Sequence, residues 1–250
     1  MARSQAIRVL NDAAMGGQAN MARDEALLVR VGRRESVPSL RLYQWETPTI
    51  SLGYFQPYAD YEALPPPAGE LPLVRRTTGG GAILHDLELT YSLTMPVGHS
   101  LTSTGANRLY ELVHEAIIAC LAILGIKATP CGISDDSGAS RGPFFCFQRR
   151  HCYDLLIGRD KIAGSAQRRT HDAVLQHGSI VLGNRHPQQP TADVQLPFEQ
   201  TVKQVRERLA TTLAAKTGEV FEEGRWSTDE LAAASTLVAK YASEDWTRRF

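Results

Sequence analysis

The hydrophobic pattern of this chain switches from a strand-like to a helical period near residue 104, and that switch limits the folds it can adopt. Before it stand five β-rich runs separated by proline and glycine: LRLYQW (40–45), TISLGYF (49–55), LPLVRRT (71–77), GAILH (81–85) and LTYSLTM (89–95). From Thr104 to Leu124 apolar residues recur at helical spacing, and Gly125 suits the C-terminal end of that helix. Short strands interrupted by long helices, rather than alternating with them, predict an α+β fold.

Local signals place the other elements. We expect a helix that begins at Asn20 as its cap and turns Met21 inward. A hairpin is predicted over 152–167 and a strand over 174–182. Two later helices are predicted: one over 197–218, and one beginning at Thr228 with Ser227 or Thr228 as its cap.

Charge and cysteine usage exclude several classes of protein. Lys plus Arg and Asp plus Glu both number 27, so there is no overall basic field, and we expect no nucleic-acid or membrane partner. The N-terminus lacks the apolar core of a signal peptide, and the longest apolar run, AIIACLAILGI, is too short to span a bilayer. The cysteines at 120, 131, 146 and 152 form no CxxC pair, so we expect reduced thiols, no metal and a cytoplasmic protein. Cys120 follows the apolar helical pattern and is expected in the core.

The stretch RRTTGGGAILHDLELTYS contains the first candidate site residues. Gly79, Gly80 and Gly81 permit positive φ and close approach of a ligand to backbone N–H groups, which can bind a phosphate, a carboxylate or an acyl carbonyl. A simple hairpin turn is the alternative. The two preceding arginines alternate faces of a strand, so at most one, such as Arg76, should point at the site. His85 follows the turn and is either a structural histidine or a site residue.

Residues 142–167 contain the candidate catalytic groups. Cys146 lies between two phenylalanines, and an apolar setting makes a thiol unreactive unless a cation holds it as a thiolate. On chemistry alone, a nucleophile and a structural thiol remain equal alternatives for Cys146. Lys161 precedes small residues at a strand start, so it either points into a pocket or is an exposed hairpin lysine. Cys152 is assigned to a strand, HCYDLLI, where packing is its expected role.

Five segments occur in the order found in the lipoate–protein ligase and octanoyltransferase family, which shares its catalytic fold with biotin–protein ligases. These are NMARDEALL (20–28), PTISLGYFQ (48–56), RRTTGGGAILHDLELTYS (75–92), KIAGSAQRR (161–169) and LQHGSIVL (175–182). This resemblance implies a central mixed or antiparallel β-sheet flanked by helices, of the class II synthetase-like type. It places the catalytic domain at residues 1–218 and a C-terminal helical extension at 219–250.

Within that family the sequence resembles the cysteine-dependent octanoyltransferases most. Cys146-Phe147, followed by Tyr153-Asp154-Leu155, takes the nucleophile's position, and Lys161 takes that of the lysine that activates the cysteine. We expect the two side chains within a few ångströms of each other. The motifs imply acyl- or substrate-binding roles for Arg76, Gly79, Gly80, Gly81, His85, Gly164, Ser165, Ala166 and His177.

The resemblance implies a reaction and partners. An octanoyl group would pass from acyl carrier protein, through a Cys146 thioester, to a lysine of a lipoyl domain or of the glycine-cleavage H protein. No cofactor is implied, and a monomer is expected. Two alternatives stay open. One is an ATP-dependent lipoate ligase, which would use ATP and Mg²⁺ and need no cysteine. The other is a non-catalytic lipoyl or acyl binder.

Two further expectations concern surfaces. The apolar residues of 81–85 and of the helix at 104–124 are expected either to line an acyl tunnel or only to pack in the core. Arginines flanking the site are expected either to form a docking patch for an acidic carrier protein or to lie on a solvated hairpin face. They are Arg149, Arg150, Arg159, Arg168 and Arg169.

Overall fold

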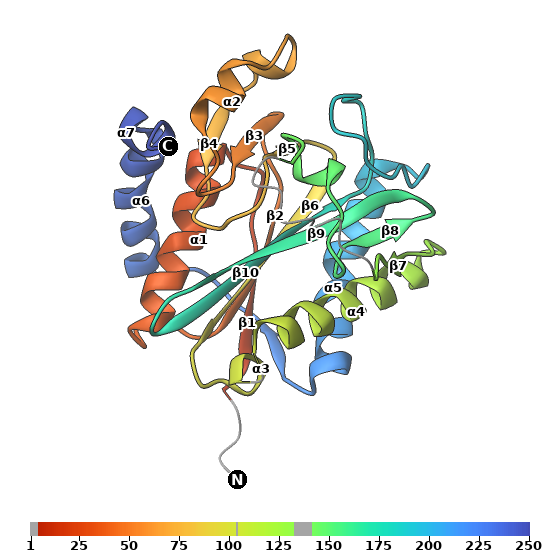
Figure 1. Ribbon diagram of the computed structural model, residues 1–250. Coiled ribbons are helices and arrows are strands. Elements are labelled where there is room, and N and C mark those ends of the chain that lie inside the picture. The colour runs from red at the N-terminus through yellow and green to blue at the C-terminus, as the bar shows by residue number, and fades with distance from the viewer. Residues whose placement is uncertain (1–4, 104, 133–141) are drawn as a thin grey trace.

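The computed structural model describes residues 5–103, 105–132 and 142–250, which form two β-sheets covered by helices (Figure 1). The main sheet has the order β11-β1-β2-β6-β10-β9-β8-β7. Its strands are β1 (Ile7–Asn11), β2 (Ser39–Tyr43), β6 (Glu88–Pro96), β7 (Thr129–Pro130), β8 (Leu155–Ile157), β9 (Asp160–Arg169), β10 (Ala173–Val181) and β11 (Phe221–Glu223). β1 runs parallel to both its neighbours and the other pairs are antiparallel, which confirms the predicted mixed sheet.

A second, three-stranded sheet covers one end of the main sheet. It has the order β4-β3-β5, with β3 (Thr49–Leu52), β4 (Leu73–Arg75) and β5 (Ile83–His85). All of its strands come from runs that the sequence predicts as β. The short helices α2 (Tyr58–Glu62) and α3 (Ser100–Ser103) lie in connecting segments.

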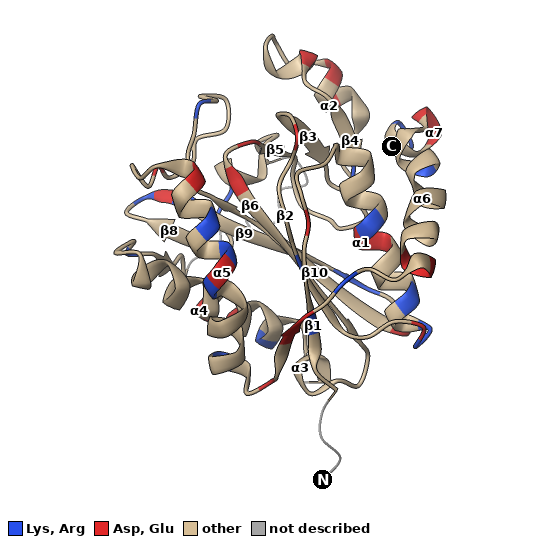
Figure 2. Ribbon diagram, turned by 180° about the vertical axis from the view of Figure 1, so that it is seen from behind, with Lys and Arg blue, Asp and Glu red and all other residues tan. Residues whose placement is uncertain are grey.

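Two helix pairs flank the main sheet on opposite sides (Figure 1). α4 (Ala106–Ile123) packs with α5 (Phe198–Thr217), and α1 (Gly17–Gly32) packs with α6 (Thr228–Ala242). A short helix, α7 (Glu244–Thr247), follows α6. Thr104, the predicted start of the α4 helix, lies outside the described residues. Seen from behind, acidic and basic residues are interspersed along α1 and α5, as the equal charge totals suggest (Figure 2).

Side-chain alternation gives the main sheet one apolar face and one polar face. Along β6, the apolar set joins the core formed with α4 and α5, while the polar set is buried on the α1 side. The apolar set is Leu89, Tyr91, Leu93 and Met95, and the polar set is Glu88, Thr90, Ser92 and Thr94. A buried polar face is unusual in a sheet core, because every buried polar group requires a partner. The α1 side is therefore where a functional site is expected.

Asn20 does not cap α1, and that prediction is wrong. The helix begins three residues earlier, at Gly17. The Asn20 side chain is fully buried: its amide donates to the carbonyl oxygens of Met15 and Gln44, and its Oδ1 accepts from Arg41. Both polar atoms of the side-chain amide are therefore engaged in hydrogen bonds that fix the segment leading into the helix. At the other predicted cap, Ser227 rather than Thr228 accepts from the backbone of Glu230.

The C-terminal residues pack behind the small sheet. The buried guanidinium of Arg75 donates twice to the carbonyl oxygen of Thr247, at 2.9 and 2.7 Å, and also to that of Gly53 at 2.8 Å. In return the Trp246 indole donates to the carbonyl oxygen of Arg75 at 2.8 Å. α5 ends at Thr217. The segment predicted as a helical extension, 219–250, also adds the strand β11 to the main sheet before α6 packs on α1. No helix among the described residues combines the length and apolarity that crossing a bilayer requires.

Glu230 on α6 forms an ion pair with Arg8 on β1, and this pair should make the free energy of unfolding depend on pH. Its buried carboxylate accepts from Arg8 at 2.6 and 2.9 Å. Burial alone would raise the pKa of Glu230, but hydrogen bonds from Arg8 and Ser227 outweigh it and lower the pKa to about 2. The stabilisation is therefore complete above the ordinary glutamate pKa and is lost as the pH falls towards 2.

We expect Glu230→Gln to lower the free energy of unfolding at pH 7 by about 2 kcal/mol, measured by urea denaturation. The difference from the wild type should shrink as the pH falls below about 4. Glu222→Gln, at an exposed position on β11, is the matched control and should have little effect. A pH-independent difference between Glu230→Gln and the wild type would contradict the assignment.

Candidate active site

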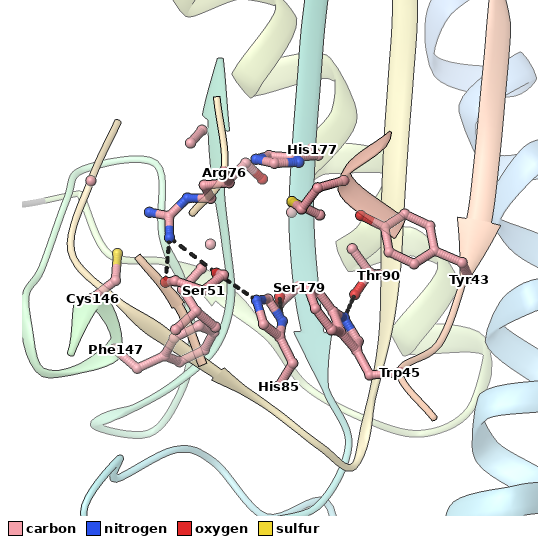
Figure 3. Close-up of a pocket in the computed structure, with 17 residues that line it drawn as sticks. Tyr43, Trp45, Ser51, Arg76, His85, Thr90, Cys146, Phe147, His177 and Ser179 are labelled. Carbon is pink, nitrogen blue, oxygen red and sulfur yellow. Dashed lines mark hydrogen bonds between the residues drawn. The ribbon is translucent and has the colours of Figure 1, made fainter. Parts of the chain in front are cut away.

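A cavity opens between the small sheet and the polar face of the main sheet (Figure 3). Cys146 and Phe147 lie towards one end and Tyr43 towards the other. Its lining residues are Met21, Tyr43, Trp45, Ser51, Arg76, Gly80, Ile83, His85, Thr90, Cys146, Phe147, Gly164, Ser165, Ala166, His177, Gly178 and Ser179. A mostly apolar cavity with a few polar groups and a thiol at one end suits an acyl chain with a reactive carbonyl.

Cys146 and Lys161 are neighbours in this site. Cys146 begins a 3₁₀ turn (Cys146–Gln148), and its backbone N–H donates to Ala82 at 2.7 Å. The Lys161 Nζ lies 3.8 Å from the Cys146 Sγ. Lys161 is only 2% exposed, so it is not an exposed hairpin lysine, and the expected proximity is confirmed. An ammonium group at this distance favours the thiolate form of a cysteine.

Asp154 is a site residue that motif analysis did not select. Its Oδ2 lies 2.8 Å from the Lys161 Nζ and also accepts from the backbone N–H of His151 at 2.8 Å. Both side chains of the ion pair are buried. The carboxylate therefore supplies a counter-charge to the ammonium whenever Cys146 is neutral, as in a thioester. Only its place in the Tyr-Asp-Leu pattern distinguished it in the sequence.

Gly164 makes room for Lys161. A Cβ at this position would lie 2.5 Å from the Lys161 Cε and 2.8 Å from its Nζ, which is closer than atoms can pack. The lysine chain thus passes directly over a glycine on its way to Cys146. In the KIAGSAQ segment, the absence of a side chain at Gly164 leaves the space that Lys161 occupies, whereas the sequence suggested only a close backbone approach.

Strand pairing decides which predicted residues face the cavity. His177 pairs with Ala166 and Ser92, and Ser179 pairs with Gly164, so these residues share the polar face. Ser165 points to the opposite face, where its hydroxyl contacts Tyr91 and His114, both at 2.6 Å. A substrate-binding role for the Ser165 hydroxyl is therefore not supported by its orientation.

His114 on α4 is a second residue that sequence analysis missed. Its Nδ1 contacts the carbonyl oxygen of Tyr153, so this nitrogen carries the proton and Nε2 accepts from the Ser165 hydroxyl. Burial lowers the pKa of His114 to about 4, which keeps it neutral. It ties α4 to β9 and to the segment that carries Asp154.

The glycine run is organised by Arg76. Its Nη2 donates to the carbonyl oxygens of Gly79 and Gly81, both at 2.7 Å. Of the three glycines only Gly80 lines the cavity, with φ of +93° and its α-carbon beside the Cys146 thiol. Gly79 and Gly81 shape the turn instead. The other predicted residues, Arg76, His85, Gly164, Ala166 and His177, all line the cavity.

Three smaller predictions are wrong. α4 does not line the cavity, because its apolar face is buried in the core on the far side of the sheet; Ile83 does line it. Cys152 is partly exposed in a turn, since β8 begins only at Leu155. The five arginines do not form one patch, because Arg159 and Arg168 flank opposite ends of β9, about 30 Å apart at the rise of a strand.

Cys120 is buried in the core as expected, and burial raises the pKa of its thiol to about 11.

Comparison with known proteins identifies the class. Residues 17–218 match the model of the lipoyl protein ligase A/B catalytic domain, and the chain belongs to that family. It is similar over nearly its whole length to proteins named octanoyltransferase LipM. The protein from Kyrpidia tusciae is 32% identical, with 98% of this chain and 99% of that protein covered. The protein from Symbiobacterium thermophilum is 33% identical, with 97% and 98% covered.

Solved structures share the fold. A putative lipoate protein ligase from T. acidophilum superposes with a TM-score of 0.77 at 24% identity, covering 98% of this chain and all of the other. A lipoate-protein ligase A bound with ATP gives a TM-score of 0.72 at 24% identity, covering 98% and 99%. These likenesses confirm the predicted lipoate-ligase-like fold.

We expect Gly164→Ala to displace Lys161 and slow the alkylation of Cys146. Without the nearby ammonium less thiol is ionised, so iodoacetamide should modify Cys146 about tenfold more slowly at pH 7, as it should in Lys161→Met. Cys146 modification is followed by mass spectrometry of its peptide. Gly16→Ala is the control, because its Cβ would meet only Gln18 at 3.7 Å. Wild-type reactivity in Gly164→Ala would show that Lys161 does not set the thiolate population.

Proposed function

We propose that this chain is an octanoyltransferase of protein lipoylation that carries the octanoyl group on Cys146. The observation that supports this most directly is the 3.8 Å contact between the Lys161 ammonium and the Cys146 thiol at one end of an apolar cavity. An enzyme that forms an acyl-adenylate needs no such pair. The full-length similarity to octanoyltransferases agrees with this function.

In the first half-reaction the Cys146 thiolate attacks the thioester carbonyl of the donor. The carbonyl oxygen becomes an oxyanion, and collapse of the intermediate expels the donor's thiolate, which takes up a proton. Cys146 is then a neutral thioester. Lys161 remains paired with Asp154, so the buried ammonium keeps a counter-charge in this state.

In the second half-reaction the neutral amine of an acceptor lysine attacks the Cys146 thioester. The C–S bond breaks, Cys146 leaves as a thiolate that Lys161 again stabilises, and the nitrogen loses a proton as the amide forms. An amide is more stable than a thioester, so this step is favourable. We propose that in both steps backbone N–H groups near Gly80 or Gly164, which line the cavity, stabilise the oxyanion; one such donor typically contributes about 10²–10³ in rate.

The proposed partners follow from this chemistry. The acceptor is a lysine on a lipoyl domain, and the glycine-cleavage H protein is a second acceptor. The donor is octanoyl–acyl carrier protein. We place the reaction in the cytoplasm and without a cofactor, metal or ATP.

The test is intact mass after mixing the protein with octanoyl–acyl carrier protein in the absence of ATP. We expect a gain of one octanoyl group that hydroxylamine removes, because a thioester is cleaved by this nucleophile. Cys146→Ser should show no labile adduct. Cys152→Ser is the matched control, as its thiol lies in a nearby turn, and it should be acylated like the wild type.

An ATP-dependent lipoate ligase is the competing function, since the superposed structures include ligases. It requires lipoate-dependent exchange between ATP and pyrophosphate, with full activity in Cys146→Ala. Observing that exchange and no octanoyl adduct would overturn the transferase assignment. Binding of octanoate without turnover would instead indicate a non-catalytic binder.

A further inference from the structure

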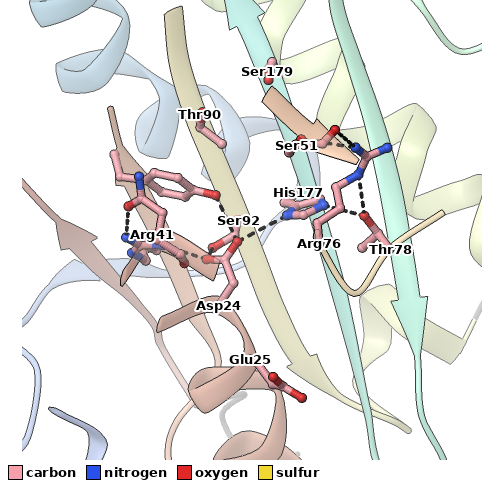
Figure 4. Close-up of polar contacts among 12 residues, drawn as sticks. Asp24, Glu25, Arg41, Ser51, Arg76, Thr78, Thr90, Ser92, His177 and Ser179 are labelled. Carbon is pink, nitrogen blue, oxygen red and sulfur yellow. Dashed lines mark hydrogen bonds and ion pairs between the residues drawn. The ribbon is translucent and has the colours of Figure 1, made fainter. Parts of the chain in front are cut away.

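His85 and His177 line the cavity, yet neither has a ring nitrogen available for substrate. The His177 Nδ1 lies 3.2 Å from Asp24 Oδ2 and its Nε2 lies 2.7 Å from the Thr78 hydroxyl (Figure 4). The His85 Nδ1 lies 2.8 Å from Glu88 Oε1 and its Nε2 lies 2.7 Å from the Ser51 hydroxyl. Each histidine therefore bridges a buried carboxylate to a hydroxyl group.

Both hydroxyl groups also contact Arg76. The guanidinium Nε donates to the Thr78 hydroxyl at 3.1 Å, and Nη1 donates to the Ser51 hydroxyl at 3.1 Å (Figures 3 and 4). Carboxylates only accept, so in a neutral ring Nδ1 donates to the carboxylate and Nε2 accepts from the hydroxyl, which in turn accepts from the guanidinium. This fixes the protonated nitrogen of both histidines as Nδ1, which donates to the carboxylate.

The result is two hydrogen-bond chains of the same type that begin at one guanidinium. One runs from Arg76 through Thr78 and His177 to Asp24. The other runs from Arg76 through Ser51 and His85 to Glu88. In the second chain, burial lowers the pKa of His85 despite the nearby carboxylate, which favours its neutral ring.

The terminal carboxylates are themselves fixed. Burial works to raise the pKa of Asp24, but the hydrogen bond from His177 and the charge of Arg41 outweigh it and lower the pKa. Arg41 is fully buried and contacts Asp24 at 2.8 Å (Figure 4). The Tyr43 hydroxyl donates to the same carboxylate at 2.9 Å. Glu88 accepts from the Ser179 hydroxyl at 3.0 Å.

Arg76 in turn fixes the glycine run. Its remaining nitrogen, Nη2, donates to the carbonyl oxygens on either side of Gly80, those of Gly79 and Gly81. Gly80 lies beside Cys146, because a Cβ there would be 4.0 Å from the thiol sulfur. The orientation of the peptide groups next to the nucleophile thus depends on the orientation of one side chain.

We propose that His85 and His177 are positioning residues that hold Arg76, and through it the Gly79–Gly81 turn, in the geometry that acyl transfer at Cys146 requires. This inference rests on the proposed acyl transfer and assigns the two histidines no contact with the acyl group through their nitrogens. The proposed role of the histidines is in stabilising the oxyanion, and it is separate from the activation of the thiol by Lys161.

The first measurement compares two reactions of Cys146. Thr78→Val and Ser51→Ala each interrupt one chain while keeping the histidine. Acyl-enzyme formation from octanoyl–acyl carrier protein, followed by rapid quenching and mass spectrometry, should slow about tenfold or more. Alkylation by iodoacetamide forms no oxyanion and should be unchanged. His171→Gln is the control, because that histidine is 97% exposed. Equal slowing of both reactions would mean that the chains act on the thiolate, and the proposal would be wrong.

The second measurement is a double-mutant cycle between His177→Ala and Arg76→Lys. A lysine cannot bond Thr78, Ser51 and the turn simultaneously, so in this background the loss of His177 should have little further effect on acylation. Additive losses would show that His177 acts independently of Arg76, which overturns the proposal. The same cycle is made with His85→Ala.

A third measurement does not depend on the reaction. The backbone amides of Arg76 and Ala82 flank the glycine turn and donate to Leu52 and Phe144. Their hydrogen exchange should accelerate in Thr78→Val and His177→Ala but not in His171→Gln. If the wild type forms no octanoyl adduct, the proposed function fails while this measurement still decides the positioning role, and unchanged exchange would refute it.

Discussion

A buried ammonium group requires a negative partner, and Lys161 has a carboxylate at 2.8 Å and a thiol at 3.8 Å. Breaking such a buried pair typically costs about 3–5 kcal/mol, so Lys161 stays where Asp154 holds it. The position of this ion pair constrains the residues around Cys146. Gly164 must lack a side chain for the lysine to pass, and the turn that carries Cys146 must begin within reach of the ammonium.

The opposite wall of the site depends on a second buried cation. Arg76 directs its guanidinium into the cavity region, whereas Arg75 directs its own towards the C-terminal residues. Among other carbonyl oxygens, Arg76 binds those of the glycine turn and Arg75 binds those of the loop at 53–56. The turn and the loop are in direct contact, since a Cβ on Gly53 would overlap the carbonyl oxygen of Gly80. Two adjacent residues, the last of β4 and the one after it, therefore connect the last helical turn of the chain to the residues around Cys146.

Local patterns in the sequence predicted most of the elements. The strands of the small sheet, β6 and β10, and the helices α4 and α5 lie within a few residues of their predicted bounds, because alternation and helical periodicity are strong there. β1 and β11 were missed, since they are short strands whose pairing partners are distant in sequence. The cap prediction at Asn20 failed for another reason. Asparagine commonly caps helices, but the Asn20 side chain accepts a hydrogen bond from Arg41, a contact that no local sequence pattern reveals.

By itself, the sequence determined the family and the fold class, and it predicted Cys146 and Lys161 as the catalytic pair, because these depend on motifs that are continuous along the chain. Only the tertiary structure decided which face each residue occupies. It turned the Ser165 hydroxyl away from the cavity, brought Asp154 to Lys161, and engaged both nitrogens of His85 and His177 in chains that lead to Arg76. The physical reason is that buried charges and hydroxyl groups must find partners across strands, and strand register, unlike periodicity, is not a local property of the sequence.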